Sequence, residues 1–373
     1  MSFFTEPSAY SLPASGLLET LALFIKTIQL RPYVFVFFAA SLFFAKRLIG
    51  WQRASLFFAI GWLTAFASEF SSTRTGIPFG WYHYTASTVR QEIYLSNVPF
   101  MDSLSFTMLL YASYCLALSF LLPSHGEGFS QDASLRNGRL LALRFDRSIR
   151  TSWPTFLLTA LFFVFIDIVI DPVALRGDRW FLGKIYYYST PGLHFGVPVA
   201  NYVGWAVVGV ITVWVYFRFD RHLPEPEQHS DRWITSNVLM GCGLYYSILL
   251  FNLTVTVWIH EPLIAMTGVL IYIPLTALLL LRLLGKLPAP TAWRQPDDWA
   301  MEGTRSLGVG YVWEVPSHWE PVSTVHLALK DRQPSSGYRA IPTRRPPQCQ
   351  QEPIHTPSWG QPAISARSSP NGS

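Results

Sequence analysis

Four carboxylates lie within or at the edge of strongly apolar stretches of the chain: Glu69, Asp102, Asp167 and Asp171. Acidic side chains in membrane spans are costly and usually mark functional sites, so these four are the candidate catalytic residues. Asp167 and Asp171 are four residues apart and therefore share one face of a helix. Because two negative charges so close in an apolar medium oppose each other, one carboxyl keeps its proton and could act as a general acid.

Two other roles remain open for these acids. They could form ion pairs that only fix the geometry of loops, and this is as consistent with the sequence as catalysis for Asp102 and Asp171. Glu69 and Asp167 have no basic neighbour in sequence, which favours a functional role for them. Buried acids could also form a proton or ion pathway, as in a small transporter. The candidate ion-pair partners are Arg74, Arg176, Arg179 and Lys184.

Three of the acids belong to two similar stretches of sequence. The first runs from Glu69 through Tyr-His-Tyr-Thr at 82–85 and Val-Pro at 98–99 to Asp102. The second runs from Asp171 through Tyr-Tyr-Tyr-Ser at 186–189 and Val-Pro at 197–198 to Asn201. The order of these features predicts a parallel internal repeat, although short aromatic-rich loops could also have converged.

Aromatic side chains and one amide surround the acids and are the candidate substrate-binding residues: Phe79, Trp81, Tyr82, Tyr84, Trp180, Tyr187, Asn201 and Trp205. Trp and Tyr also gather at membrane interfaces for reasons unrelated to substrate. Beside acids, however, aromatic rings suit a flat polyene and can stabilise a transient carbocation. The sequence contains no phosphate-binding glycine loop, dinucleotide fingerprint, nucleophile elbow or metal-ligand spacing, so we expect neither a cofactor nor a metal.

Composition predicts the elements that hold these residues. Half of the chain is apolar and 14% is charged, whereas about a quarter of a soluble protein is charged. The sequence therefore predicts an all-α integral membrane protein with about seven transmembrane helices. A preceding segment at 16–30 contains Glu19 and Lys26 and is better explained as an interfacial helix than as an eighth span. The predicted spans are about 32–46, 52–71, 99–122, 153–172, 200–219, 233–257 and 262–284.

Most Lys and Arg residues near the predicted spans fall on one side of the membrane if the seven spans alternate in direction. The positive-inside rule then places the C-terminus in the cytoplasm of a multi-pass protein of the cell membrane. The net charge of +5 follows from this distribution, so it does not indicate nucleic-acid binding.

We divide the chain into an N-terminal segment (1–30), a membrane catalytic domain (31–286) and a tail (287–373). The tail is rich in Pro, Ser, Gln and Arg, a composition that predicts a largely disordered segment. Its aromatic patch from Trp293 to Trp319 could fold back or contact lipid.

Three strings resemble the carotenoid biosynthesis proteins, which include carotenoid 1,2-hydratases and bisanhydrobacterioruberin hydratases. They are Gly-Ile-Pro-Phe-Gly-Trp-Tyr-His-Tyr-Thr (76–85), Asp-Ile-Val-Ile-Asp-Pro-Val-Ala (167–174) and Gly-Val-Pro-Val-Ala-Asn-Tyr-Val-Gly-Trp (196–205). The resemblance covers about residues 30–285. It implies a cofactor-independent membrane enzyme that adds water to the terminal double bond of an acyclic carotenoid, in contact with membrane lipid and other enzymes of the pathway.

This chemistry agrees with the residues. Asp167 or Glu69 would donate the proton, Asp171 would tune that donor, and Asp102 and Asn201 would position water. A carotenoid cyclase or isomerase also begins by protonating an alkene, so it remains an alternative, as does a small proton-coupled transporter. The sequence does not identify the substrate, because enzymes for carotenoids of different length and end group would have the same pattern of acids and aromatic residues.

Because the tail lacks a core-forming pattern, truncation after about residue 287 should leave the membrane domain folded and active. Activity per amount of inserted protein measures this. Loss of activity at normal protein levels would show that the patch from Trp293 to Trp319 belongs to the site.

Overall fold

Seven long apolar helices dominate the computed structural model, which describes residues 16–123, 143–224 and 230–287. Within these ranges seven helices are long and apolar enough to cross a membrane, which confirms the predicted number of spans. The proposed tail, its aromatic patch and most of the loop before α6 lie outside the described residues. The seven helices are α2 (Pro32–Ile49), α3 (Trp51–Thr75), α4 (Phe100–Leu121), α6 (Trp153–Ala174), α7 (Val199–Asp220), α8 (Asp231–Trp258) and α9 (Pro262–Leu283).

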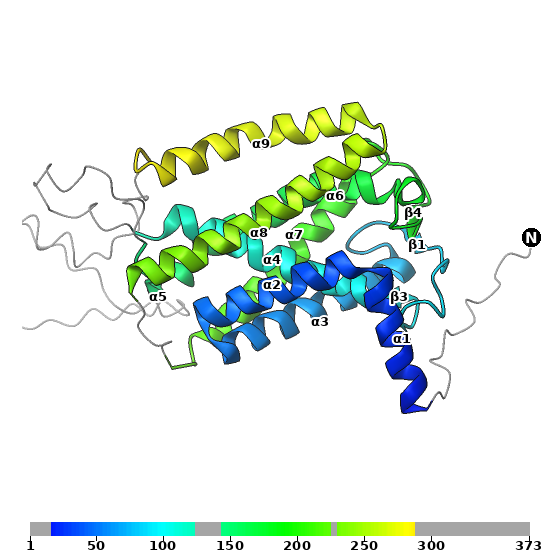
Figure 1. Ribbon diagram of the computed structural model, residues 1–373, viewed down its shortest axis with the longest axis horizontal. Helices are drawn as coiled ribbons and strands as arrows, with labels where there is room; N and C mark the ends of the chain where they lie inside the picture. Colours follow the sequence, from blue (N-terminus) through cyan, green and yellow to red (C-terminus); the bar gives the residue numbers. More distant parts are fainter. Residues whose placement is uncertain (1–15, 124–142, 225–229, 288–373) are drawn as a thin grey trace, which may run out of the picture. The chain divides into compact units, whose positions relative to one another are not determined.

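Helix α4 lies at the centre of the bundle (Figure 1). It packs against α2, α3, α6, α8 and α9, and nearly all of its residues are buried. Helix α9 lies along the outer edge and buries few residues, as expected for a span that faces lipid on most sides (Figure 1). The central helix is the one whose first turn contains Asp102.

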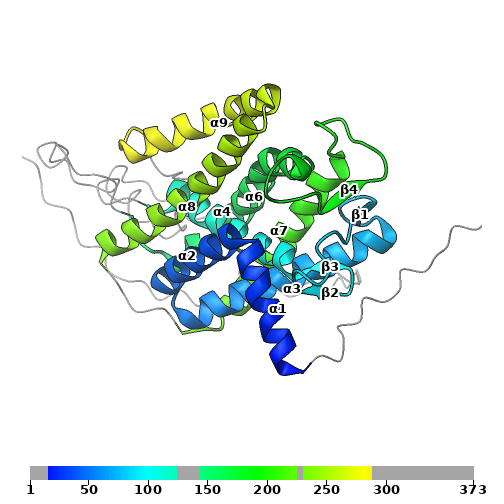
Figure 2. The same ribbon diagram turned by 45° about the vertical axis from the view of Figure 1, so that its right-hand side comes forward.

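A shorter helix, α1 (Leu17–Leu30), precedes the bundle and lies at a steep angle to α2 (Figures 1 and 2). At the corner between the two helices the buried Arg31 guanidinium donates to the carbonyl of Leu182 and lies 3.3 Å from Glu92. The predicted segment at 16–30 is therefore a separate helix and not one of the seven spans. Its interfacial position remains a prediction.

Two short strands connect the repeated stretches. Strand β1 (Tyr82–Tyr84) pairs with β4 (Tyr186–Tyr188) in an antiparallel register that places Tyr82 opposite Tyr188 and Tyr84 opposite Tyr186. Since β1 follows α3 and β4 follows α6, the C-terminal ends of both helices meet at one end of the bundle (Figure 2). Helix α3 packs on α4 and α7, and α6 packs on the same two helices. This packing is the one expected if the two stretches are related by a two-fold axis along the bundle.

A valine-proline step precedes the helix that follows each stretch. Strand β3 (Val98–Pro99), which pairs with β2 (Tyr94–Leu95), leads into α4, and Pro198 leads into α7. Both prolines have the extended conformation of a residue that precedes a helix. The two steps therefore place Asp102 and Asn201 in the first turns of their helices, at the end where β1 and β4 pair.

The sequence around Pro172 favours a helix end at Asp171. Helix α6 instead continues through Pro172 to Ala174. The carbonyl of Pro172 accepts a hydrogen bond of 2.9 Å from the Arg176 side chain, so a side chain satisfies a backbone group at this end. Asp171 thus lies in the last turn of α6 and is buried.

A buried ion-pair cluster fixes the opposite end of the bundle. Asp220, at the end of α7, lies 2.5 Å from the guanidinium nitrogens of Arg53 in α3 and of Arg150 in α5 (Arg147–Arg150). All three side chains are almost fully buried. Partners this close offset part of the cost of placing charge in an apolar interior.

Gly204 of α7 allows the loop after α3 to approach the bundle. A Cβ at this position would lie 2.2 Å from a ring atom of Phe79 and 2.9 Å from its Cα. Gly204→Ala should therefore displace Phe79 and lower thermal stability in detergent, despite the better helix propensity of alanine.

Gly243 of α8 is the matched control, because a Cβ there meets no atom within 4 Å. Gly243→Ala should leave the unfolding temperature unchanged or slightly raised. Equal effects of the two substitutions would contradict the close approach at Gly204.

Candidate active site

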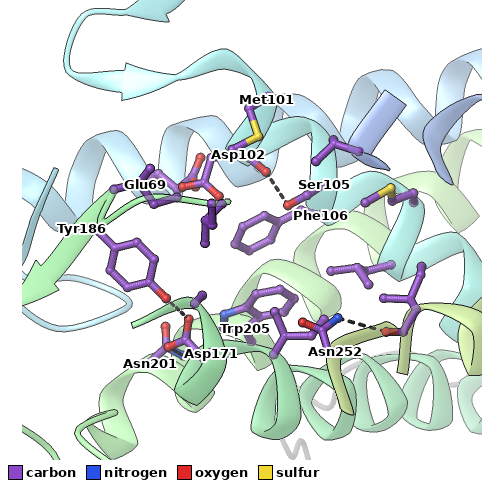
Figure 3. Close-up of a pocket in the computed structure, with 18 of the residues that line it drawn as sticks. Glu69, Met101, Asp102, Ser105, Phe106, Asp171, Tyr186, Asn201, Trp205 and Asn252 are labelled. Atoms are coloured by element: carbon purple, nitrogen blue, oxygen red, sulfur yellow. Dashed lines mark hydrogen bonds between the residues drawn. The ribbon is translucent and has the colours of Figure 1, made fainter. Parts of the chain in front are cut away.

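A cavity opens between the helices near the paired strands and contains most of the predicted site residues (Figure 3). Its empty volume is about 960 Å³, including the open mouth. Side chains of α2, α3, α4, α6, α7 and α8 line it, together with residues of the loops and of β1 and β4. Polar groups gather at the end near the strands, and most of the remaining lining is apolar.

The first polar cluster joins the two acids of the first stretch. The Tyr84 hydroxyl oxygen lies 3.0 Å from Glu69 Oε1 and 2.7 Å from Asp102 Oδ2. The Ser103 hydroxyl donates to the other oxygen of Glu69. Glu69 is buried, whereas Asp102 is partly open to the cavity. One phenol therefore bridges two carboxylates from different helices.

The second polar cluster surrounds Asp171. Its Oδ1 accepts a hydrogen bond from the Tyr186 hydroxyl, as Figure 3 shows. Its Oδ2 accepts from the Tyr188 hydroxyl at 3.0 Å and from the Asn201 amide at 2.9 Å. Three donors to one carboxylate stabilise its ionised form. The cluster thus places a carboxyl group with three hydrogen-bond donors at the wall of the cavity.

Asp167 lies behind the second cluster. Its Oδ2 accepts a hydrogen bond of 2.8 Å from the Asn201 amide, and Oδ1 is buried without a partner among the described residues. Asp167 is fully buried and does not line the cavity. Because both amide hydrogens of Asn201 go to the two aspartates, its carbonyl oxygen is the atom left to bind another donor.

A stacked aromatic pair lies between the two clusters in Figure 3. The rings of Phe106 and Trp205 are 4.3 Å apart and nearly parallel. Phe106 follows Asp102 by four residues, and Trp205 follows Asn201 by four residues, so each ring belongs to the same helix face as the polar group of its stretch. The two stretches thus contribute equivalent positions to one site.

Most of the predicted substrate-binding residues do line this cavity: Phe79, Tyr82, Tyr84, Trp180, Asn201 and Trp205. Trp81 and Tyr187 do not, and they are 54% and 44% exposed. Successive residues of a strand point to opposite faces, so Tyr187 points away when Tyr186 and Tyr188 point inward. Trp81 packs back against Gly76, where a Cβ would lie 2.7 Å from the indole nitrogen.

Several lining residues were not predicted from the sequence. Tyr33 of α2 and Phe251 of α8 stack with ring centroids 5.3 Å apart. Asn252 of α8 also lines the cavity, with its amide nitrogen bonded to the Ile248 carbonyl at 2.9 Å. A polar side chain within an apolar span is a signal that could have identified Asn252. The two aromatic residues had no such signal.

The four inward-facing tyrosines of β1 and β4 stay neutral. Burial raises the pKa of the phenols of Tyr82, Tyr84, Tyr186 and Tyr188 well above the usual value, and the nearby carboxylates raise it further. Each phenol therefore keeps its proton and can donate one hydrogen bond.

Among residues 16–123, 143–224 and 230–287, no group of three or more His, Cys, Asp or Glu side chains could hold a metal ion. The polar groups at the cavity wall are mainly carboxyl, phenol and amide groups.

Comparisons with known proteins agree with the sequence resemblance. The family described as "Carotenoid biosynthesis protein" matches residues 30–275, which include every element of the cavity. A bisanhydrobacterioruberin hydratase from Haloarcula japonica is 28% identical over 218 residues. The matched region is 58% of this chain and 62% of that protein, so the chain spans less than two thirds of this relative's length. No solved structure matches.

Asp171→Asn should destabilise the protein, because an amide provides one acceptor where the carboxylate accepts three hydrogen bonds. Buried donors left unsatisfied cost about 1–3 kcal/mol each, so the unfolding temperature in detergent should fall. Asp178→Asn, at an exposed position, is the control and should have no effect. A rise in stability for Asp171→Asn would show that the three donors do not satisfy the carboxylate.

Proposed function

Because this chain belongs to the carotenoid biosynthesis protein family, we propose that it hydrates the terminal double bond of an acyclic carotenoid end group. The observation that carries the proposal is the cavity itself, in which two carboxylate clusters lie beside a stacked aromatic pair within an apolar helical bundle. The hydratase activity of the relative from Haloarcula japonica supports the same reaction class.

The first step is protonation of the alkene. Glu69 lines the cavity and Asp167 does not, so the geometry favours Glu69 over Asp167 as the source of the proton. The π electrons of the double bond form the new C–H bond at the less substituted carbon, and the other carbon becomes a tertiary cation. General acid catalysis of this kind contributes about 10²–10⁴-fold to a rate.

The tertiary cation must then be stabilised by groups that do not form a lasting covalent bond with it. The faces of Phe106 and Trp205 provide electrostatic stabilisation, and the ionised carboxylate of Asp171 adds a negative charge. This use of Asp171 differs from the tuning role expected from the sequence.

Water completes the reaction. The free carbonyl oxygen of Asn201 can accept a hydrogen bond from a water molecule near Asp171. A lone pair of the water forms the C–O bond, and its excess proton passes to Asp171. The product is a tertiary alcohol. Return of one proton from Asp171 to solvent, and of another from solvent to the donor, restores the site.

The same observations favour hydration over the two alternative functions. A cyclase must keep water away from the cation, whereas Asn201 and Asp171 place two acceptors beside it. A proton-coupled transporter needs no large apolar cavity, whereas Phe37, Met108, Leu109 and Ile248 extend this one toward α2, α4 and α8. Both features support hydration of an apolar substrate.

We also propose that the protein is a multi-pass protein of the cell membrane, with the C-terminus in the cytoplasm. The seven spans and the distribution of Lys and Arg support this orientation. The site would then lie on the non-cytoplasmic side, where a carotenoid could enter from the lipid.

Expression of the chain in a host that makes an acyclic carotenoid should give a product heavier by one water for each modified end. Mass spectrometry of the extracted pigments measures this, with Glu69→Gln as the inactive control at equal protein level. A product of unchanged mass with a new ring would indicate a cyclase instead. Unchanged pigments on several acyclic substrates would contradict both enzymes.

A further inference from the structure

The hydroxyl of Tyr84 is within hydrogen-bond distance of two carboxyl groups, at 3.0 Å from Glu69 and 2.7 Å from Asp102. A phenol has one proton and can donate only one hydrogen bond. Its oxygen can still accept. Both contacts are therefore hydrogen bonds only if one of the two carboxyl groups carries a proton and donates it to the Tyr84 oxygen.

We infer that Glu69 and Asp102 act as one acid that holds a single proton, shared through the hydroxyl of Tyr84. In one form Glu69 is protonated and donates to Tyr84, which donates to Asp102. In the other form Asp102 is protonated, and both hydrogen bonds are reversed. In going from the first form to the second, the Glu69 proton moves to the Tyr84 oxygen as the Tyr84 proton moves to Asp102. Both protons shift in the same direction along their hydrogen bonds, and no heavy atom changes place.

This exchange places the acidic proton where the substrate can reach it. Glu69 is buried beneath Tyr84 and Ser103, whereas Asp102 is partly open to the cavity. Asp102 therefore delivers the proton to the alkene, and Glu69 supplies it through Tyr84. After delivery the dyad has lost one proton, which solvent must return before the next cycle. Asp102 is thus a catalytic residue and Tyr84 a positioning residue that also transfers the proton.

The second stretch has the same tyrosine but not the same arrangement. Tyr188, the counterpart of Tyr84, contacts Asp171, and the position of Asp102 is taken by Asn201. The Asn201 amide donates a hydrogen bond to Asp171 but has no acidic proton to share with it. Asp171 consequently receives only donors and stays ionised, so the two stretches provide an acid and a base, respectively.

The properties of Tyr84 support its role. Burial raises the pKa of its phenol, as do the adjacent Asp102 and Glu69 carboxylates, so the hydroxyl remains protonated. Ser103 cannot replace it, because its hydroxyl contacts Glu69 and not Asp102. Within the described residues, Tyr84 is the one side chain within hydrogen-bond distance of both acids, and the pairing of β1 with β4 holds it in place.

The inference rests on the proposed hydration, so the first test uses turnover of an acyclic carotenoid by full-length protein in membranes. Glu69→Gln and Asp102→Asn should each reduce hydration by about 10²-fold or more, since either change removes the shared proton. The double variant should be no slower than either single variant, because residues that act as a unit are not additive. Near-normal turnover of Asp102→Asn, or a much slower double variant, would overturn the inference.

A second test does not depend on turnover. The infrared spectrum of the purified protein should contain the carbonyl band of a protonated carboxylic acid that disappears in both Glu69→Gln and Asp102→Asn. If Glu69 alone held the proton, Asp102→Asn would retain this band, and the shared acid would be disproved. Tyr84→Phe should shift or remove the band, whereas the matched variant Tyr188→Phe should leave it in place.

The two tests separate the two claims. If the wild-type protein hydrates no acyclic carotenoid but the band behaves as stated, the proposed function fails and the shared proton stands. If hydration is observed and the band of Asp102→Asn is unchanged, the function stands and the shared proton fails.

Discussion

The structure depends on one constraint: acids placed in an apolar bundle must be satisfied by hydrogen bonds from within the protein. Bulk water is largely excluded from a bundle of apolar membrane-spanning helices, and an unsatisfied charge there is very costly. The pairing of β1 with β4 meets the requirement, because it holds Tyr84, Tyr186 and Tyr188 over the ends of α3, α4 and α6. The strands are only three residues long, yet their register decides which oxygen each hydroxyl reaches.

The same requirement explains the close packing around the site. The loop that contains Phe79 approaches α7 only because Gly204 has no side chain. Arg31 ties the loop containing Glu92 to that containing Leu182, and so couples the two repeated stretches at the corner of α1 and α2. At the other end, Asp220 holds α7 against α3 and α5. The end that contains the cavity is therefore held by hydrogen bonds to loops, and the far end by buried ion pairs.

Much of this arrangement could be predicted from the sequence. The length of the apolar segments, the alternation of side chains along a strand and the high free-energy cost of an acid in a membrane span all leave a visible pattern. Apolar length gives the seven spans, and Glu69, Asp102 and Asp171 attract attention because acids are rare in such spans. The exposed side of Tyr187 could also have been predicted from the alternation of a strand. Tyr33 and Phe251 could not, because an aromatic residue in a span looks the same whether it faces a cavity or lipid. The bridging role of Tyr84 depends on distances of a few tenths of an ångström, which no spacing rule provides.

The proposed addition of water requires the two similar stretches to differ, because one must supply a proton and the other must accept one. Two identical acids facing one cavity would hold the same number of protons, and neither would be fixed as the donor or the acceptor. Here the first stretch has Asp102 where the second has Asn201, and the second has Asp167 one turn before Asp171 where α3 has Ala65 one turn before Glu69. The amide replaces one acid and donates to Asp167 and Asp171, which leaves its carbonyl oxygen to bind another donor. In the proposed mechanism this donor is the attacking water. Under the proposed mechanism, the exchange of Asp102 for Asn201 is the difference that separates an acid in the first stretch from a base in the second, while the pairing of β1 with β4 keeps the tyrosines above both in register.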